Sequence, residues 1–140
     1  MTEQDKQLER AAIDFAKTHR TRIANELTDT DIYLPEPHPV SVFMAGSPGA
    51  GKTETSKAFL EELQAEHIIR LDPDDLRAYF DQYDGSNSFL FQSAVSLTVE
   101  RTLDKAFTRR QSFLLDGTLS NYQVAHKNVK RSLDKKRDVL

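Results

Sequence analysis

The segment from Gly46 to Thr53, GSPGAGKT, fits the pattern G-x-x-x-x-G-K-[ST] at every fixed position. An apolar run at residues 40–45 precedes it and is typical of a buried strand, and residues 54–63 follow it with the composition of a helix. Strand, glycine-rich loop and helix are the context that a phosphate-binding P-loop requires. The pattern therefore predicts an α/β fold organised around a nucleotide phosphate.

The residue types in this segment suit a nucleoside triphosphate. Glycines lack a Cβ, so the backbone can curl and direct its N–H groups at phosphate oxygens, and the next helix adds the positive end of its dipole. We expect Lys52 to reach the β- and γ-phosphates and the Thr53 hydroxyl to take one position on Mg²⁺. The predicted ATP-binding residues are Gly46, Ser47, Pro48, Gly49, Ala50, Gly51, Lys52 and Thr53.

Composition limits the other function classes. The chain has 140 residues, 38% of them hydrophobic and 29% charged, which is enough for one globular domain with one core. A net charge of −3 gives no support to a general nucleic-acid or membrane-surface protein, and the lack of cysteine excludes thiolate sites. With no long apolar run and no signal-peptide core at the N-terminus, we expect a cytoplasmic location and no membrane partner.

The order of the predicted elements indicates a parallel sheet. A helix at residues 3–28 and a proline-rich connector form a first part, 1–39, and the P-loop domain takes up 40–140. Strands alternating with helices pair in parallel through right-handed crossovers. After residue 63 we expect strands at 67–71 and 113–117, helices starting near 74 and covering 88–110 and 122–137, and a further strand beginning at 138.

Acidic residues follow the predicted strands, and ligands in such sheets bind at the carboxyl ends of strands. Asp116 ends an apolar strand, which makes it a candidate Mg²⁺ partner, direct or through a second shell, beside the plainer interpretation of a turn residue. Of Asp72, Asp74 and Asp75, one could act as general base on an acceptor hydroxyl while the others cap a helix. Glu100 lies within the long helix and faces either solvent or the cleft.

The remaining polar positions allow two interpretations each. Thr118, Ser120 and Asn121 could bind acceptor hydroxyls or form a turn. The basic stretch 126–137 is typical of a solvated helix face; a nucleic-acid patch is the alternative, but no aromatic residues interleave with the charges. The four histidines have no ligand-like spacing and are interpreted as structural or surface residues.

Three motifs together resemble the zeta toxins, P-loop kinases of bacterial toxin–antitoxin systems. They are residues 43–54 (FMAGSPGAGKTE), 71–77 (LDPDDLR) and 114–118 (LLDGT). The resemblance implies ATP- and Mg²⁺-dependent phosphorylation of UDP-N-acetylglucosamine at the sugar 3′-hydroxyl, and an antitoxin protein as partner. It also implies Asp74 as catalytic base, Lys52 as phosphate lysine, Glu100, Thr118 and Arg77 as acceptor-binding residues, and Thr53 and Asp116 at the metal.

The chain departs from that family in two places. Ser120-Asn121 stands where characterised toxins carry an arginine, and family members continue past position 140 with further strands and an arginine-bearing lid. We therefore expect the C-terminal strands and lid to be missing and the P-loop strand to expose an edge. Three functions follow as hypotheses: a zeta-type small-molecule kinase, an inactive nucleotide-binding or antitoxin-binding module, and another P-loop phosphotransferase acting on an antibiotic or a polynucleotide end.

Overall fold

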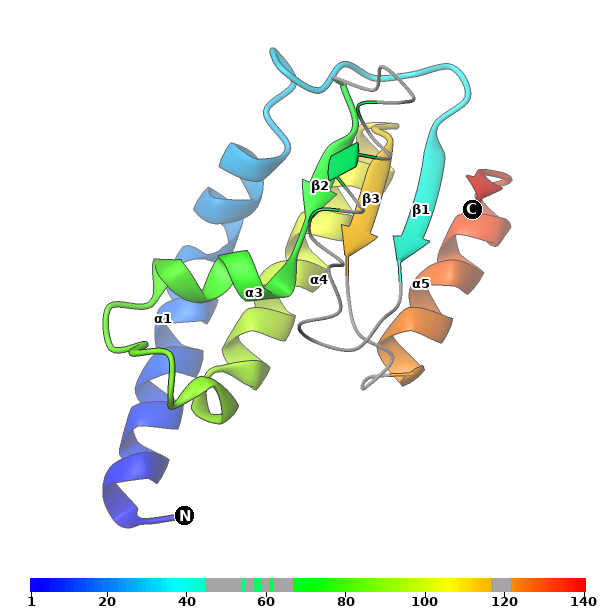
Figure 1. The fold of residues 1–140 in the computed structure, drawn as a ribbon. Coiled ribbons are helices and arrows are strands. Elements are labelled where there is room, and N and C mark those ends of the chain that lie inside the picture. The colour runs from blue at the N-terminus through cyan, green and yellow to red at the C-terminus, as the bar shows by residue number, and fades with distance from the viewer. Residues whose placement is uncertain (45–53, 55–56, 59–60, 62–66, 117–121) are drawn as a thin grey trace. The chain divides into compact units, whose positions relative to one another are not determined.

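The computed structural model describes residues 1–44, 54, 57–58, 61, 67–116 and 122–140, drawn in colour in Figure 1. They form two compact units, each built from two chain segments. One unit contains Met1–Leu27 and Pro73–Lys105, and the other contains Thr28–Asp72 and Ala106–Leu140. The predicted P-loop at 46–53 and the positions Thr118, Ser120 and Asn121 lie outside the described residues.

The second unit is a parallel sheet, which confirms the predicted fold class. Its strands are β1 (Val40–Met44), β2 (Ile69–Leu71), β3 (Phe113–Asp116) and β4 (Asp138–Val139), in the spatial order β2-β3-β1-β4. Every strand pair is parallel. The described residues of the predicted helix after the P-loop, Glu54, Lys57, Ala58 and Glu61, are helical.

β1, the strand that precedes the P-loop, has a neighbour on both sides. It pairs with β3 along Ser41 to Met44 and with β4 through Val40 and Ser41. The Leu140 N–H donates to the Ser41 carbonyl, and the Phe43 N–H donates to the Leu140 carbonyl. The prediction of an exposed edge on this strand was therefore wrong, because the last three residues of the chain supply the second partner.

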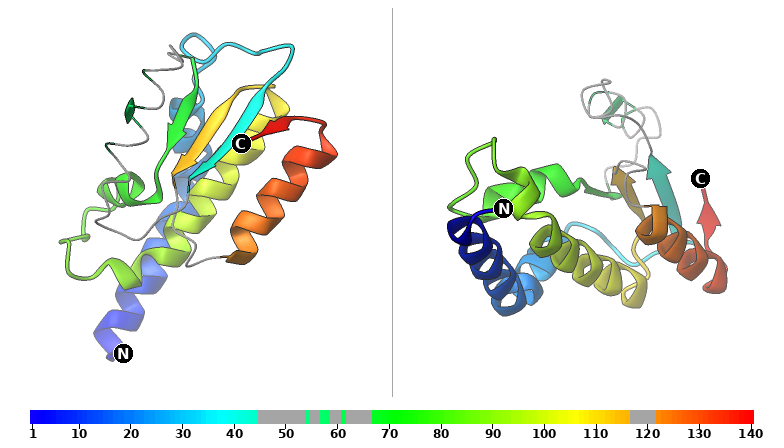
Figure 2. Two further views of the ribbon diagram at one scale, coloured as in Figure 1. Left: turned by 45° about the vertical axis from the view of Figure 1, so that its right-hand side comes forward. Right: turned by 90° about the horizontal axis from the view of Figure 1, so that it is seen from below.

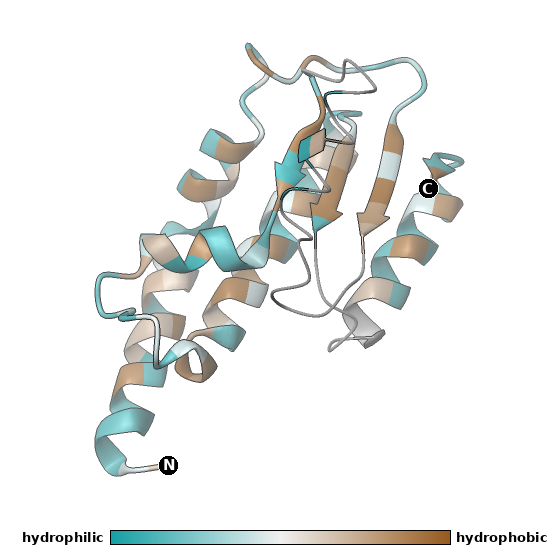
Figure 3. Cartoon of the chain, in the orientation of Figure 1, coloured by the Kyte–Doolittle hydropathy of each residue, from teal (hydrophilic) through white to brown (hydrophobic). Residues whose placement is uncertain are grey.

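The core of this unit is centred on β3. All four residues of β3 are buried, as expected for a strand paired on both sides, and Figure 3 shows hydrophobic colour along most of β1 and β3. The Phe113 ring packs edge-on against Phe43 and Phe107, with centroids 5.8 and 5.5 Å away. Helix α5 (Tyr122–Asp134) lies against β1 and β4, as Figures 1 and 2 show, and the buried Ser132 hydroxyl donates to the Ser41 hydroxyl at 2.9 Å.

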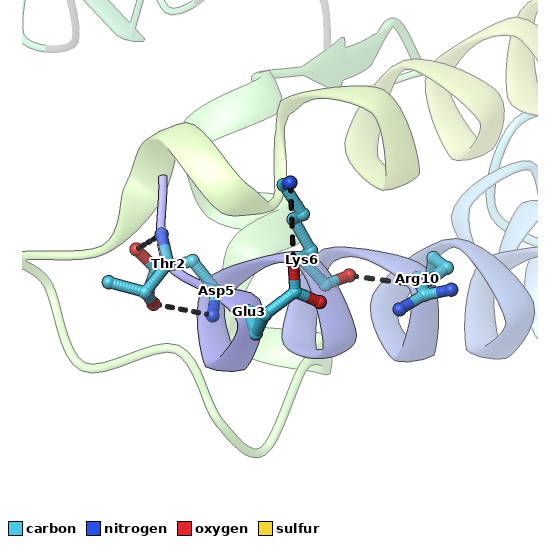
Figure 4. Close-up of polar contacts among 5 residues, drawn as sticks. All are labelled: Thr2, Glu3, Asp5, Lys6 and Arg10. Atoms are coloured by element: carbon cyan, nitrogen blue, oxygen red, sulfur yellow. Dashed lines mark hydrogen bonds and ion pairs between the residues drawn. The ribbon is translucent and has the colours of Figure 1, made fainter.

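The first unit begins with helix α1 (Glu3–Leu27), close to its predicted bounds. Thr2 caps it: the Thr2 hydroxyl accepts from the Asp5 N–H at 3.0 Å, and the Asp5 carboxylate accepts from the Thr2 N–H at 3.3 Å, as Figure 4 shows. This reciprocal pair satisfies two backbone donors that a helix start leaves open. The face that α1 buries consists of Ala12, Ala16, Ile23 and Ala24.

The rest of the first unit is α3 (Pro73–Leu76), the 3₁₀ turns η1 (Arg77–Tyr79) and η2 (Ser88–Leu90), and most of α4 (Gln92–Thr108). The single helix predicted over 88–110 is thus a 3₁₀ turn followed by a helix. Ring contacts join Phe15 to Phe80, Phe80 to Phe91 and Tyr83 to Phe91. Among the helices described, none has the length and apolar character needed to cross a bilayer.

Candidate active site

The strand register brings Asp116 to the start of the predicted P-loop. Met44, the last residue of β1, pairs with Asp116, the last residue of β3. The P-loop pattern begins at Gly46, two residues beyond Met44. Asp116, whose side chain is fully buried, therefore lies beside the last described residue before the P-loop pattern. We call this side of the sheet, where β1, β2 and β3 end, the carboxyl edge.

An arginine links two acids at the carboxyl edge. The Arg70 guanidinium, on β2, donates from Nη2 to the Asp116 carboxylate at 2.7 Å and to the Asp72 carboxylate at 3.2 Å. Asp116 and Asp72 are 0% and 4% exposed, and the Arg70 side chain is 14% exposed. Such short charge-assisted contacts between shielded groups fix the orientation of each carboxylate. Arg70 thus holds Asp116 through one of its two oxygens.

The sequence around Arg70 explains why this contact forms. Arg70 is the one charged residue in the short strand Ile69–Leu71, and β2 pairs with β3 so that Arg70 and Leu114 are partners. Carboxylates stabilise a guanidinium at a largely buried position, since a buried charge without any polar partner would cost on the order of several kcal/mol. Asp72 follows the last residue of β2, and Asp116 is the last residue of β3, so both carboxylates lie near Arg70.

Asp74, the predicted catalytic base, lies in the first turn of α3 and is exposed. Its carboxylate pairs with the Arg77 guanidinium one helical turn later, at 3.1 Å, and the two side chains are 55% and 22% exposed. Pro73 occupies the first position of α3, where a missing N–H costs nothing. The Arg77 guanidinium also lies 5.9 Å from the centre of the Tyr83 ring. Arg77 therefore holds Asp74 from the protein side while leaving it open to solvent.

Two further observations concern the same segment. Arg77 Nε is buried and, among the described residues, has no hydrogen-bond acceptor. Burial and the Glu26 carboxylate raise the pKa of Tyr79 above its ordinary value. Glu100, a predicted acceptor-binding residue, lies on α4 and is half-buried.

The structure brings some of the predicted residues together. Asp74 contacts Arg77, and Asp116 is joined through Arg70 to Asp72. Lys52, Thr53 and Thr118 lie outside the described residues, and no group of three or more His, Asp or Glu able to hold a metal ion occurs within them.

Arg70 is the residue that the sequence interpretation missed. The sequence contained a signal for it: a lone cation inside an apolar strand, two residues before a run of acids, favours an ion pair with those acids.

Comparison with known proteins identifies the family. The family model described as zeta toxin matches residues 23–139, most of the chain. The chain belongs to the zeta toxin family. Among solved structures, it is similar to a chain from the PezAT chromosomal toxin–antitoxin system of Streptococcus pneumoniae, with a TM-score of 0.74 and 20% sequence identity.

That alignment covers 99% of this chain and 55% of the pneumococcal one, so the sequence spans about half the length of the zeta toxin structure that it matches. No curated protein has a significant match to the sequence. At this level of identity the structural likeness establishes the zeta toxin fold, and the sequence match establishes the family.

Proposed function

We propose that this chain carries the nucleotide-binding half of a zeta-type kinase, which transfers the γ-phosphoryl group of ATP to a small acceptor. The observation that carries the proposal is the pairing of Met44 with Asp116, because it sets a buried acid beside the start of a complete P-loop sequence. A phosphate loop and an acid on adjacent parallel strands are the two parts that P-loop kinases use to hold nucleotide and Mg²⁺.

Each residue has a distinct role in the proposed reaction. Lys52 and the loop backbone bind the phosphates, and the Thr53 hydroxyl and Asp116 bind the magnesium ion, which lowers the charge of the phosphates. Because Arg70 already occupies one oxygen of Asp116, we propose that Asp116 reaches the ion through a coordinated water. Mg²⁺ prefers oxygen ligands and commonly keeps several waters, so a hydroxyl and a water-bridged carboxylate are suitable ligands for it.

Asp74 takes the proton from the acceptor hydroxyl as the new P–O bond forms. Its ion pair with Arg77 limits the rotamers of the carboxylate, and its exposure leaves an oxygen accessible to a substrate. Glu100, Thr118 and Arg77 complete the acceptor site in this proposal. The proposed acceptor is UDP-N-acetylglucosamine, at the sugar 3′-hydroxyl, because the family to which the chain belongs supplies the best precedent for these residues.

Two matched acids on α3 provide the sharpest test of Asp74. Asp74→Asn and Asp75→Asn remove one charge each from adjacent exposed positions of the same helix. The rate of label transfer from [γ-³²P]ATP to UDP-N-acetylglucosamine should fall by about 10²- to 10⁴-fold in Asp74→Asn, because a general base usually contributes a rate factor of that size. In Asp75→Asn the rate should stay within about twofold. Equal transfer by the two variants would remove Asp74 from the mechanism.

A second candidate function is a module that binds nucleotide or an antitoxin without turnover, because the solved relative comes from a toxin–antitoxin system. Titration with a fluorescent ATP analogue separates the two. Both candidates predict binding that weakens by at least about tenfold in Lys52→Ala. The kinase alone predicts labelled product, and testing the chain beside a version extended past Leu140 shows whether turnover needs a further segment.

The identity of the acceptor is tested by a panel. The chain and its extended version are incubated with labelled ATP and UDP-N-acetylglucosamine, other nucleotide sugars, an aminoglycoside or a DNA oligonucleotide with a free 5′ end. We expect label in the nucleotide sugar. Label in the antibiotic or the oligonucleotide instead would assign the chain to another class of P-loop phosphotransferase.

A further inference from the structure

A cavity of about 420 Å³ lies at the opposite side of the sheet, which we call the amino edge because β1 and β4 begin there. Four cationic residues line it: Arg110, Lys135, Lys136 and Arg137. Pro39, which precedes the first paired residue of β1, and Asp138, the first paired residue of β4, also line it. The cavity is therefore separated from the carboxyl edge by the length of the strands, and none of its residues belongs to the predicted kinase site.

Two helix C-termini with the same hydrogen-bond pattern form the walls of the cavity. In α4 the Gln111 N–H donates to the Ala106 carbonyl and the Arg110 N–H to the Phe107 carbonyl; in α5 the Arg137 N–H donates to the Ser132 carbonyl and the Lys136 N–H to the Leu133 carbonyl. This is the Schellman arrangement, which places one residue in the left-handed region and usually uses glycine there.

Here those two positions are Arg110, with φ 55°, and Lys136, with φ 57°. A residue with a side chain is strained in this backbone conformation compared with the right-handed one. Each helix end therefore carries a cation at a position where a glycine would be less strained, and both cations line the same cavity.

The third basic group, Arg137, is buried at 6% exposure. Its guanidinium donates to the carbonyls of Gln111 and Ala106 at 2.8 and 3.1 Å and lies 4.8 Å from the centre of the Phe107 ring. Within the described part of the chain, none of the four cations that line the cavity forms an ion pair with a carboxylate. The groups that contact the Arg137 guanidinium directly are therefore neutral.

The helix dipoles and carboxylates near the cavity do not fully compensate its positive charge. Two helix C-termini contribute about half a negative charge each. Asp138, in the lining, and Glu36, whose carboxylate acts on Arg137 from nearby, contribute two more. Against the four cations this leaves about one positive charge in excess, and His38 in the lining adds to it when protonated.

We propose that this cavity binds a small phosphate monoester. A phosphate group carries about 1.5 to 2 negative charges at pH 7 and accepts several hydrogen bonds, so it suits a site with excess positive charge and the donors of arginine and lysine. A volume of about 420 Å³ falls in the range typical of small-ligand sites, about 300 to 1,000 Å³, and exceeds what a bare phosphate fills. A partly open site of this size accommodates a small phosphorylated molecule.

Titration of the ¹⁵N-labelled full chain with glycerol 3-phosphate, followed by NMR, tests this proposal. A Lys52→Ala background removes binding at the predicted P-loop. We expect saturable shifts of the amides around residues 107–111 and 135–138, tighter binding of glycerol 3-phosphate than of inorganic phosphate, and no such shifts with sodium chloride at equal ionic strength. Tighter binding of inorganic phosphate would assign the site to the free ion and overturn the ester.

A pair of double variants distinguishes the site from general charge. Lys135→Gln/Lys136→Gln removes two cations of the lining, and Lys17→Gln/Lys130→Gln removes two exposed cations outside it. Affinity for glycerol 3-phosphate should fall by about tenfold in the first and stay within about twofold in the second. Equal losses in both, or binding of RNA without a saturable response to glycerol 3-phosphate, would overturn the proposal.

Discussion

The two edges of one sheet each hold a buried arginine, and they compensate its charge in opposite ways. At the carboxyl edge Arg70 contacts two carboxylates, Asp72 and Asp116, at 3.2 and 2.7 Å. At the amino edge Arg137 contacts backbone carbonyls, the Ser41 hydroxyl and aromatic rings. The first arrangement is neutralised within the protein and orients an acid; the second leaves positive charge available to an anion. The same residue type thus serves positioning at one edge and attraction at the other.

Among substitutions that test this difference between the two edges, we expect the largest loss of stability at Arg70. Arg70→Met removes the cation that two buried carboxylates share, and the loss of one partner of a buried ion pair costs roughly 3–5 kcal/mol. Urea denaturation measures the change in the free energy of unfolding. Arg22→Met is the matched control, because Arg22 pairs with Glu26 at an exposed position and should cost less than about 1 kcal/mol. Similar costs for the two would mean that the Arg70 contacts contribute no more than a surface pair.

Arg137→Met should lower the free energy of unfolding by less than Arg70→Met does. It leaves the Gln111 carbonyl without the bond from Arg137, whereas the Ala106 carbonyl keeps its bond from the Gln111 N–H. One unsatisfied buried carbonyl costs about 1–3 kcal/mol, and removal of an uncompensated buried charge offsets part of that. The same urea titration ranks the two variants. A cost for Arg137→Met above that for Arg70→Met would contradict the difference in compensation between the edges.

Lys136→Gly should change stability and binding in opposite directions. Glycine relieves the left-handed strain at φ 57°, roughly 1–2 kcal/mol, but restores backbone freedom to the unfolded chain, about 0.4–1 kcal/mol, so a net gain of about 0.5–1 kcal/mol is expected. Affinity for glycerol 3-phosphate should fall, because the cation is gone. Arg110→Gly is the matched comparison: Arg110 has nearly the same φ, but its side chain also donates to the Pro37 carbonyl, so its net gain should be smaller.

Sequence patterns predicted the elements of the sheet because the apolar strands and the P-loop context are local. They also predicted Asp116 at a strand end and Asp74 on a helix that follows β2. They missed the second neighbour of β1, since two paired residues of β4 carry almost no pattern of their own and the pairing depends on where α5 delivers the chain.

The charged residues were harder to interpret, because burial of a charge depends on distant partners. Arg137 was included in a solvated helix face, but α5 ends at Asp134 and Arg137 turns inward to the carbonyls of another segment. One sequence feature could have indicated this: 107–112 and 133–138 both pass from a helix through two or three consecutive basic residues to a strand. Two such connections in a parallel sheet meet at its amino edge.

The smallest expected effect concerns pH at the amino edge. Burial, followed by repulsion from Arg110, lowers the pKa of Arg137 to about 10, while Glu36 acts in the opposite sense. Below that pH the group is protonated in both the folded and unfolded chain, so the stability difference between wild type and Arg137→Met should stay constant from pH 6 to about pH 9. Above pH 10 the folded chain releases the proton before the unfolded chain does, and the wild type should gain relative to the variant. Urea titrations at several pH values measure this difference, and a change in it between pH 6 and 8 would mean that another group titrates in contact with Arg137.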